Sequence, residues 1–140
     1  MTTSGQPVEV LLAEDNPGDA RLTEKAFDQG NILNNLHVVE DGVEAMRFLR
    51  REDEYREKPR PDLVLLDLNM PKKDGWDVLE EIKEDPDLSR IPVIVLTSSE
   101  AEEDIVKSYE LQANAYLTKP VSDDDLREME AEHFYSTLRC

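Results

Sequence analysis

The sequence contains one cysteine, Cys140, so no disulfide bond can form within the chain. Stable disulfides are typical of secreted proteins, and their absence favours a reducing compartment. No apolar run approaches the roughly 20 residues that a membrane-spanning helix needs. The first seven residues lack the basic and then apolar segments of a secretion signal. We therefore expect a cytoplasmic protein without a membrane anchor, and a flexible N-terminus over residues 1–7.

Basic residues are also scarce. The chain has 16 Lys and Arg against 33 Asp and Glu, which gives a net charge of -17 over 140 residues. Nucleic-acid backbones are bound by basic surfaces, so direct binding to DNA or RNA is not expected. A solvated acidic surface explains the excess of acidic residues most simply. Such a surface suits a salt-rich, halophilic cytoplasm or a basic binding partner.

The hydrophobic content of 39% is distributed in short runs that alternate with helical patterns. The runs are too short for helices and are typical of buried strands; they cover residues 8–13, 36–39, 64–66, 91–96 and 115–118. Helix signals lie between Asn16 and Gly30, from Asp41 to Leu49, from 72–75 to Asp85, from Ser99 to Leu111 and from Ser122 onwards. The alternation predicts one α/β domain over residues 8–140, a doubly wound five-stranded parallel sheet with helices on both faces.

Two further expectations concern the region around the second predicted helix. Val43, Met46 and Leu49 are spaced as one helical face, which predicts that all three point into the core. The charged stretch over residues 50–61 is rich in polar side chains and ends with two prolines. We expect this stretch to be an exposed connection.

Polar side chains follow four of the predicted strands. Glu14 and Asp15 follow the first strand, Asp67 the third, Thr97 the fourth and Lys119 the last. Because the carboxyl ends of parallel strands share one edge of a sheet, these five side chains should lie close together. Carboxylates this close repel one another unless a cation lies among them, and oxygen ligands favour Mg²⁺.

The same set of residues suits phosphoryl transfer. Thr97 supplies a hydroxyl donor and Lys119 a compact positive charge for the oxygens of an incoming phosphoryl group. Asp67 could then act as a nucleophile and form an acyl phosphate. Taken singly, each residue could instead be a helix cap, a strand end or a surface charge. Taken together, four polar strand ends at one edge are not needed for stability, which favours a chemical site.

These residues resemble the receiver domains of two-component response regulators, and the similarity covers nearly the whole chain. The resemblance rests on Glu14-Asp15, Asp67, Asn69, Met70-Pro71, Asp74-Gly75, Thr97, Tyr116 and Lys119-Pro120. It implies that Asp67 accepts the phosphoryl group, and that Glu14, Asp15, Asp67 and the Asn69 backbone carbonyl hold Mg²⁺. It also implies a switch formed by Thr97 and Tyr116, and a cis proline after Lys119.

The segments at 15–19, 39–42 and 67–75, with the charged insertion before Pro59, look most like stand-alone regulators that partner phytochrome-type sensor histidine kinases. The implied function is to accept a phosphoryl group from such a kinase, or from a phosphotransfer protein in a phosphorelay, and to change a partner-binding surface. The resemblance implies no turnover of an external substrate. With no output domain expected, a homodimer anchored by Phe134 and Tyr135 is one predicted way for the signal to leave.

Two alternatives belong to other classes of protein. A phosphatase of the haloacid dehalogenase type also uses an aspartate nucleophile, a lysine and Mg²⁺. Such enzymes need a second acid two residues after the nucleophile, and Asn69 occupies that position here. A phosphorylation-independent interaction module would be expected to have a damaged acidic site, whereas this one looks intact.

Overall fold

A computed structural model describes residues 7–98, 107 and 110–131 of the chain. Three predictions lie outside the described residues: the flexible N-terminus over residues 1–6, the start and inner face of the helix from Ser99, and the aromatic pair Phe134 and Tyr135. From Val8 to Thr97 strands alternate with helices, as the sequence predicts, and a further strand and helix follow from Ala115 to Ala131.

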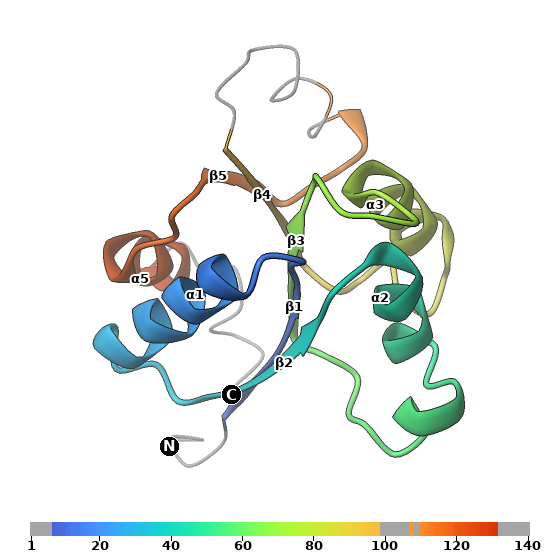
Figure 1. Ribbon diagram of the computed structural model, residues 1–140, viewed down its shortest axis with the longest axis horizontal. Helices are drawn as coiled ribbons and strands as arrows, with labels where there is room; N and C mark the ends of the chain where they lie inside the picture. Colours follow the sequence, from blue (N-terminus) through green and yellow to red (C-terminus); the bar gives the residue numbers. More distant parts are fainter. Residues whose placement is uncertain (1–6, 99–106, 108–109, 132–140) are drawn as a thin grey trace.

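The centre of the molecule is a parallel sheet with the strand order β2-β1-β3-β4-β5 (Figure 1). Its strands are β1 Val8–Ala13, β2 Asn34–Val39, β3 Leu63–Asp67, β4 Val93–Thr97 and β5 Ala115–Thr118. All four pairings are parallel, so the carboxyl ends of the strands meet at one edge. The predicted doubly wound five-stranded sheet is confirmed.

Helices cover both faces of the sheet. α1 Pro17–Gln29 and α5 Asp123–Ala131 lie on one face, and α2 Gly42–Leu49 and α3 Gly75–Glu84 lie on the other (Figure 1). Side chains cap three of these helices: Asn16, Asp41 and Asp74 each accept a hydrogen bond from a main-chain N–H in the first turn of their helix. Each cap fixes where a helix leaves the edge that carries the candidate site.

Two apolar cores separate the sheet from its helices. Phe48 and Leu79 are buried between the sheet and the α2 and α3 helices, whereas Phe27 and Leu126 are buried between the sheet and the α1 and α5 helices. Strands β3 and β4 are buried along their whole length. A strand that is covered on both faces needs continuous apolar residues, which explains why these two runs were recognisable in the sequence.

The prediction for the inner face of α2 was wrong at Val43, which is 40% exposed. Ala45 and Phe48 are buried instead, together with Met46 and Leu49. Gly42 and Ala45 in the same first turn are buried, so Val43 lies on the side of the helix that faces away from the sheet. The spacing of three and four residues fits several faces of a helix, so it did not identify the buried one.

The connection after α2 is more structured than the sequence suggested. It contains a short 3-10 helix, Asp53–Tyr55, and the Tyr55 ring lies 5.3 Å from the ring of Phe48. The Tyr55 hydroxyl donates a hydrogen bond to Glu44 at 2.6 Å. The segment is therefore fastened to α2 by Tyr55 and by ion pairs of Arg47 with Asp53 and Glu54, although most of its side chains are exposed.

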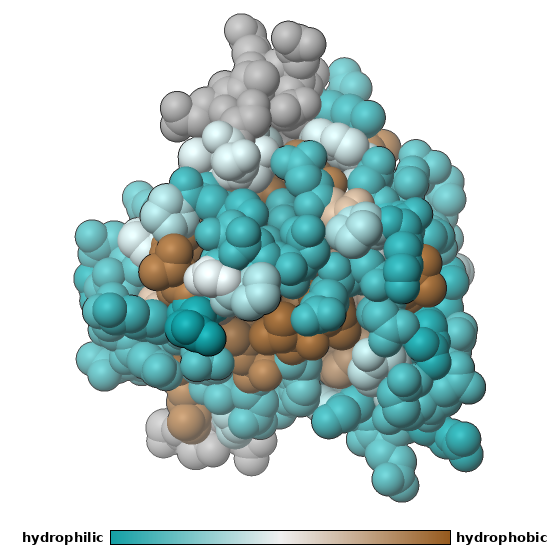
Figure 2. Space-filling model, in the orientation of Figure 1, coloured by the Kyte–Doolittle hydropathy of each residue, from teal (hydrophilic) through white to brown (hydrophobic). Residues whose placement is uncertain are grey.

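The surface is predominantly polar. Figure 2 shows hydrophilic residues over most of one face, with a hydrophobic strip across the middle, near strands β1 and β2. Within the described residues, no helix combines the length and the apolar character needed to span a membrane.

Candidate functional site

The site lies at the carboxyl edge of the sheet, where β1 and β3 end side by side. β1 leads directly into Glu14 and Asp15, and β3 ends with Asp67. One carboxylate oxygen from each of the three residues lies within 4.8 Å of the others. Glu14 and Asp67 are buried, whereas Asp15 is exposed. Three carboxylates this close form a concentrated negative charge with one side open to solvent.

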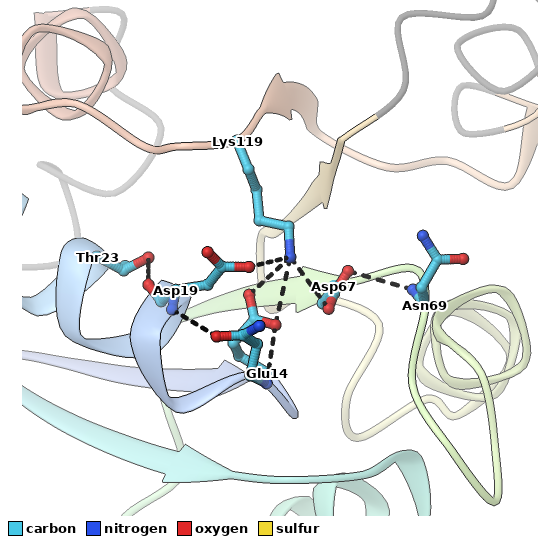
Figure 3. Close-up of polar contacts among 7 residues, drawn as sticks. Glu14, Asp19, Thr23, Asp67, Asn69 and Lys119 are labelled. Atoms are coloured by element: carbon cyan, nitrogen blue, oxygen red, sulfur yellow. Dashed lines mark hydrogen bonds and ion pairs between the residues drawn. The ribbon is translucent and has the colours of Figure 1, made fainter.

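Lys119 brings a positive charge to the same place from the end of β5 (Figure 3). Its Nζ atom lies 3.0 Å from Glu14 Oε1, 3.0 Å from Asp19 Oδ2 and 3.3 Å from Asp67 Oδ2. Its backbone N–H donates to the carbonyl oxygen of Thr97 at 2.7 Å, and the Lys119-Pro120 peptide bond is cis. The ammonium group therefore occupies the space between β1, β3 and the start of α1.

Burial and charge determine the protonation of these groups. Burial raises the pKa of Glu14 to about 7, the neighbouring Asp67 carboxyl adds to this rise, and Lys119 opposes it. Burial lowers the pKa of Lys119, but the hydrogen bonds that its ammonium donates to Asp19 and Glu14 outweigh this effect and hold the pKa above its usual value. Without a further cation, the cluster therefore holds more negative charge than Lys119 neutralises.

The loop after β3 is tightly packed beneath Asp67. The main-chain N–H of Asn69 donates to Asp67 Oδ1 at 3.2 Å, and Gly75 N–H donates to the Leu68 carbonyl at 3.1 Å. A Cβ atom on Gly75 would lie 2.5 Å from the Asp67 carbonyl oxygen. Only glycine allows this close approach of α3 to the backbone that carries Asp67.

Comparison with known proteins identifies the family. The family model for the response regulator receiver domain matches residues 10–130 of this chain. The chain belongs to the response regulator receiver family. The response regulator Rcp1 from Synechocystis sp. is 50% identical over 126 residues, which cover 90% of this chain and 86% of that protein.

Solved structures agree with this assignment. The phosphorylated cyanobacterial phytochrome response regulator RcpA is 45% identical with a TM-score of 0.81, over 95% of this chain and 96% of that chain. The Mn²⁺-bound form of Rcp1 is 46% identical with a TM-score of 0.80, over 94% of this chain and 96% of that chain. The resemblance to phytochrome response regulators is confirmed, and neither the dehalogenase-type phosphatase nor the phosphorylation-independent module is favoured.

Thr97 and Tyr116 lie beside the receiver site, on neighbouring strands. Thr97 is the last residue of β4 and is buried, and Tyr116 is half-buried in β5. Thr97 pairs with Thr118 and Val95 pairs with Tyr116, so Thr97 and Tyr116 are diagonal neighbours. In a parallel pair such neighbours project from the same face of the sheet, which places Tyr116 towards the core under α2 and α3.

The structure adds one residue that sequence reasoning missed. Asp19 lies in the first turn of α1 and its carboxylate contacts Lys119 as closely as Glu14 does. An acid in the first turn of a helix is commonly explained by the helix dipole, so its presence gave no separate signal.

Proposed function

We propose that this receiver accepts a phosphoryl group on Asp67 from the phosphohistidine of a sensor histidine kinase or a phosphotransfer protein. The observation that carries this proposal is the arrangement around Asp67. Its carboxylate is buried, lies within 4.8 Å of two other acidic groups and is 3.3 Å from the ammonium of Lys119. A fixed positive charge beside a nucleophilic carboxylate offsets the charge that develops in phosphoryl transfer.

The proposed transfer forms one bond and breaks one bond. An Oδ atom of Asp67 attacks the phosphorus atom, the N–P bond of the phosphohistidine breaks, and the departing imidazole keeps the electron pair. Lys119 then donates to a phosphoryl oxygen in place of Asp67, and the Thr97 hydroxyl donates to another. Hydrolysis of the acyl phosphate by water would return Asp67 to its original state, so the chain would catalyse only its own modification and its reversal.

The acidic residues fit a magnesium ion. Burial raises the pKa of Glu14 to about 7, so ionising it has a cost that a bound cation would offset. Glu14, Asp15 and Asp67 supply the oxygen ligands that Mg²⁺ prefers, and we assign the backbone carbonyl of Asn69 to the same set. When bound, the ion would neutralise charge on the phosphoryl oxygens. The Mn²⁺-bound form of Rcp1 supports this assignment.

The phosphoryl group would be read by Thr97 and Tyr116. A dianionic group beside Thr97 gives the hydroxyl a new acceptor and draws it towards Asp67. Tyr116, its diagonal neighbour on β5, could then turn into the space that Thr97 leaves. Partner binding through this altered surface, by a target protein or a second copy, is the proposed output. The kinase would take its phosphoryl group from ATP in the cytoplasm, so we expect this chain to act in the same compartment.

Incubation with acetyl phosphate and Mg²⁺ tests the proposed function. Intact-mass measurement should show one added phosphoryl group on the wild-type protein and none on Asp67→Asn. The matched control is Asp28→Asn, the same chemical change at an exposed position in the last turn of α1. Removal of Mg²⁺ with EDTA should abolish the reaction, because two anions must then meet without a bridging cation. Phosphorylation of Asp67→Asn to the wild-type extent would refute the assignment.

A further inference from the structure

Among the described residues, Asp19 is the one carboxylate in contact with Lys119 that comes from a helix and lies outside the acidic cluster. Figure 3 shows the ammonium between Asp19 on one side and Asp67 on the other, with Glu14 below. The Nζ atom is 3.0 Å from Asp19, closer than its 3.3 Å to Asp67. A lysine ammonium has three N–H donors, so one donor for each carboxylate leaves none unused.

Helix capping does not explain the orientation of the Asp19 side chain. In a capping box, an acid at the third helical position accepts a hydrogen bond from the N–H of the capping residue. Here the Asn16 N–H donates to Glu14 Oε2 at 3.3 Å instead. The Asp19 backbone is fixed separately, because its N–H donates to Asn16 Oδ1 and its carbonyl accepts from the Thr23 hydroxyl. The carboxylate is thus left to contact Lys119.

Two effects of Asp19 on phosphoryl transfer oppose each other. It helps to hold Lys119 in place, which favours the reaction, and it adds negative charge beside an anion-binding site, which disfavours it. The holding effect is small, because Glu14 contacts the ammonium through both oxygens and the Lys119 backbone is bound to Thr97. The charge effect is direct, because Asp19 and Asp67 contact the same nitrogen atom. Repulsion should therefore dominate.

We propose that Asp19 slows the phosphorylation of Asp67, a kinetic restraint that arises because its negative charge beside Lys119 repels the incoming phosphoryl group. It keeps one donor of the ammonium directed towards α1 and repels the incoming dianion. This inference rests on the proposed function. It assigns to α1 a control over how readily the receiver becomes modified.

The test compares Asp19→Asn with the wild-type protein in the acetyl phosphate reaction. Asparagine keeps a hydrogen-bond acceptor and removes the charge. The initial rate of phosphoryl uptake, followed by intact mass, should rise on the order of three- to tenfold, as expected for removing one charge at this distance from a partly exposed site. Asp19→Glu, which keeps the charge, should react at the wild-type rate. Asp28→Asn removes the same charge elsewhere on α1 and should also leave the rate unchanged.

Two further measurements separate restraint from a general effect on structure. Beryllofluoride, a stable mimic of the phosphoryl group, should half-saturate Asp19→Asn at a lower concentration than wild type, by ¹⁹F NMR. The difference in rate between the two proteins should narrow as KCl is added, because the Asp19 side chain is 35% exposed and its field is screened. Asp28→Asn, which loses the same net charge, controls for the effect of KCl on folding, since its rate should match that of wild type at every KCl concentration.

The outcomes distinguish the two proposals. A rate for Asp19→Asn equal to or below that of wild type, with the wild type itself modified on Asp67, would overturn the restraint and leave the proposed function standing. An equal rise in Asp28→Asn would also overturn it, since net charge would then suffice. No phosphoryl uptake by the wild-type protein would overturn the proposed function itself.

Discussion

At the scale of single residues, Glu14 should make the stability of the metal-free receiver depend on pH. Its pKa is raised to about 7 in the folded protein from a usual value of 4.5. Between these values the folded state binds more protons than the unfolded state, so the free energy of unfolding contributed by Glu14 falls as pH rises. One pKa unit corresponds to about 1.4 kcal/mol, so the whole effect is on the order of 3 kcal/mol.

Urea unfolding in EDTA between about pH 5 and 8 measures this effect. The wild-type protein should lose stability relative to Glu14→Gln across this range, because glutamine cannot ionise. Saturating Mg²⁺ should reduce the loss, since metal binding favours the ionised carboxylate. Parallel pH profiles for the two proteins would show that Glu14 ionises in the folded state as readily as in the unfolded state.

At the scale of elements, the loop after β3 depends on the glycine that begins α3. Gly75→Ala should push the Asp67 backbone aside, because the added Cβ would lie 2.5 Å from its carbonyl oxygen. Overpacking of this kind costs about 1–3 kcal/mol, and the shift should also slow phosphoryl uptake. Gly18→Ala is the matched control, since its Cβ would meet only the end of the Asn16 side chain at 3.2 Å. Equal stability and uptake in the two variants would contradict this packing.

The elements also show how far the sequence could be used for prediction. Local patterns specify buried strands and capped helices, so the sheet and its helices could be predicted. Because the strands are parallel, the sequence also predicted that Glu14, Asp67 and Lys119 meet at one edge. The outward turn of Val43 and the docking of Tyr55 on Phe48 depend on contacts between elements. Asp19 meets Lys119 across 100 residues of sequence, and no local pattern records such a pair.

At the scale of the whole molecule, the net charge of -17 should make the fold sensitive to salt. Dense carboxylates repel one another more strongly in the compact state than in the unfolded chain, and ions screen that repulsion. The screening length falls from about 30 Å at 0.01 M salt to about 3 Å at 1 M. The thermal midpoint should therefore rise with KCl, most steeply at low concentrations, where long-range repulsion is removed first.

Thermal melts in EDTA across this range of KCl test the prediction without a contribution from the metal site. Sucrose serves as the control, because it stabilises proteins by exclusion from their surface and leaves charge repulsion unscreened. A steep rise with KCl that levels off towards 1 M, against a gradual rise with sucrose, is the expected result. Equal midpoints in dilute and concentrated KCl would instead mean that the carboxylates lie too far apart to repel. The acidic surface would then be explained better by a basic partner than by a salt-rich cytoplasm.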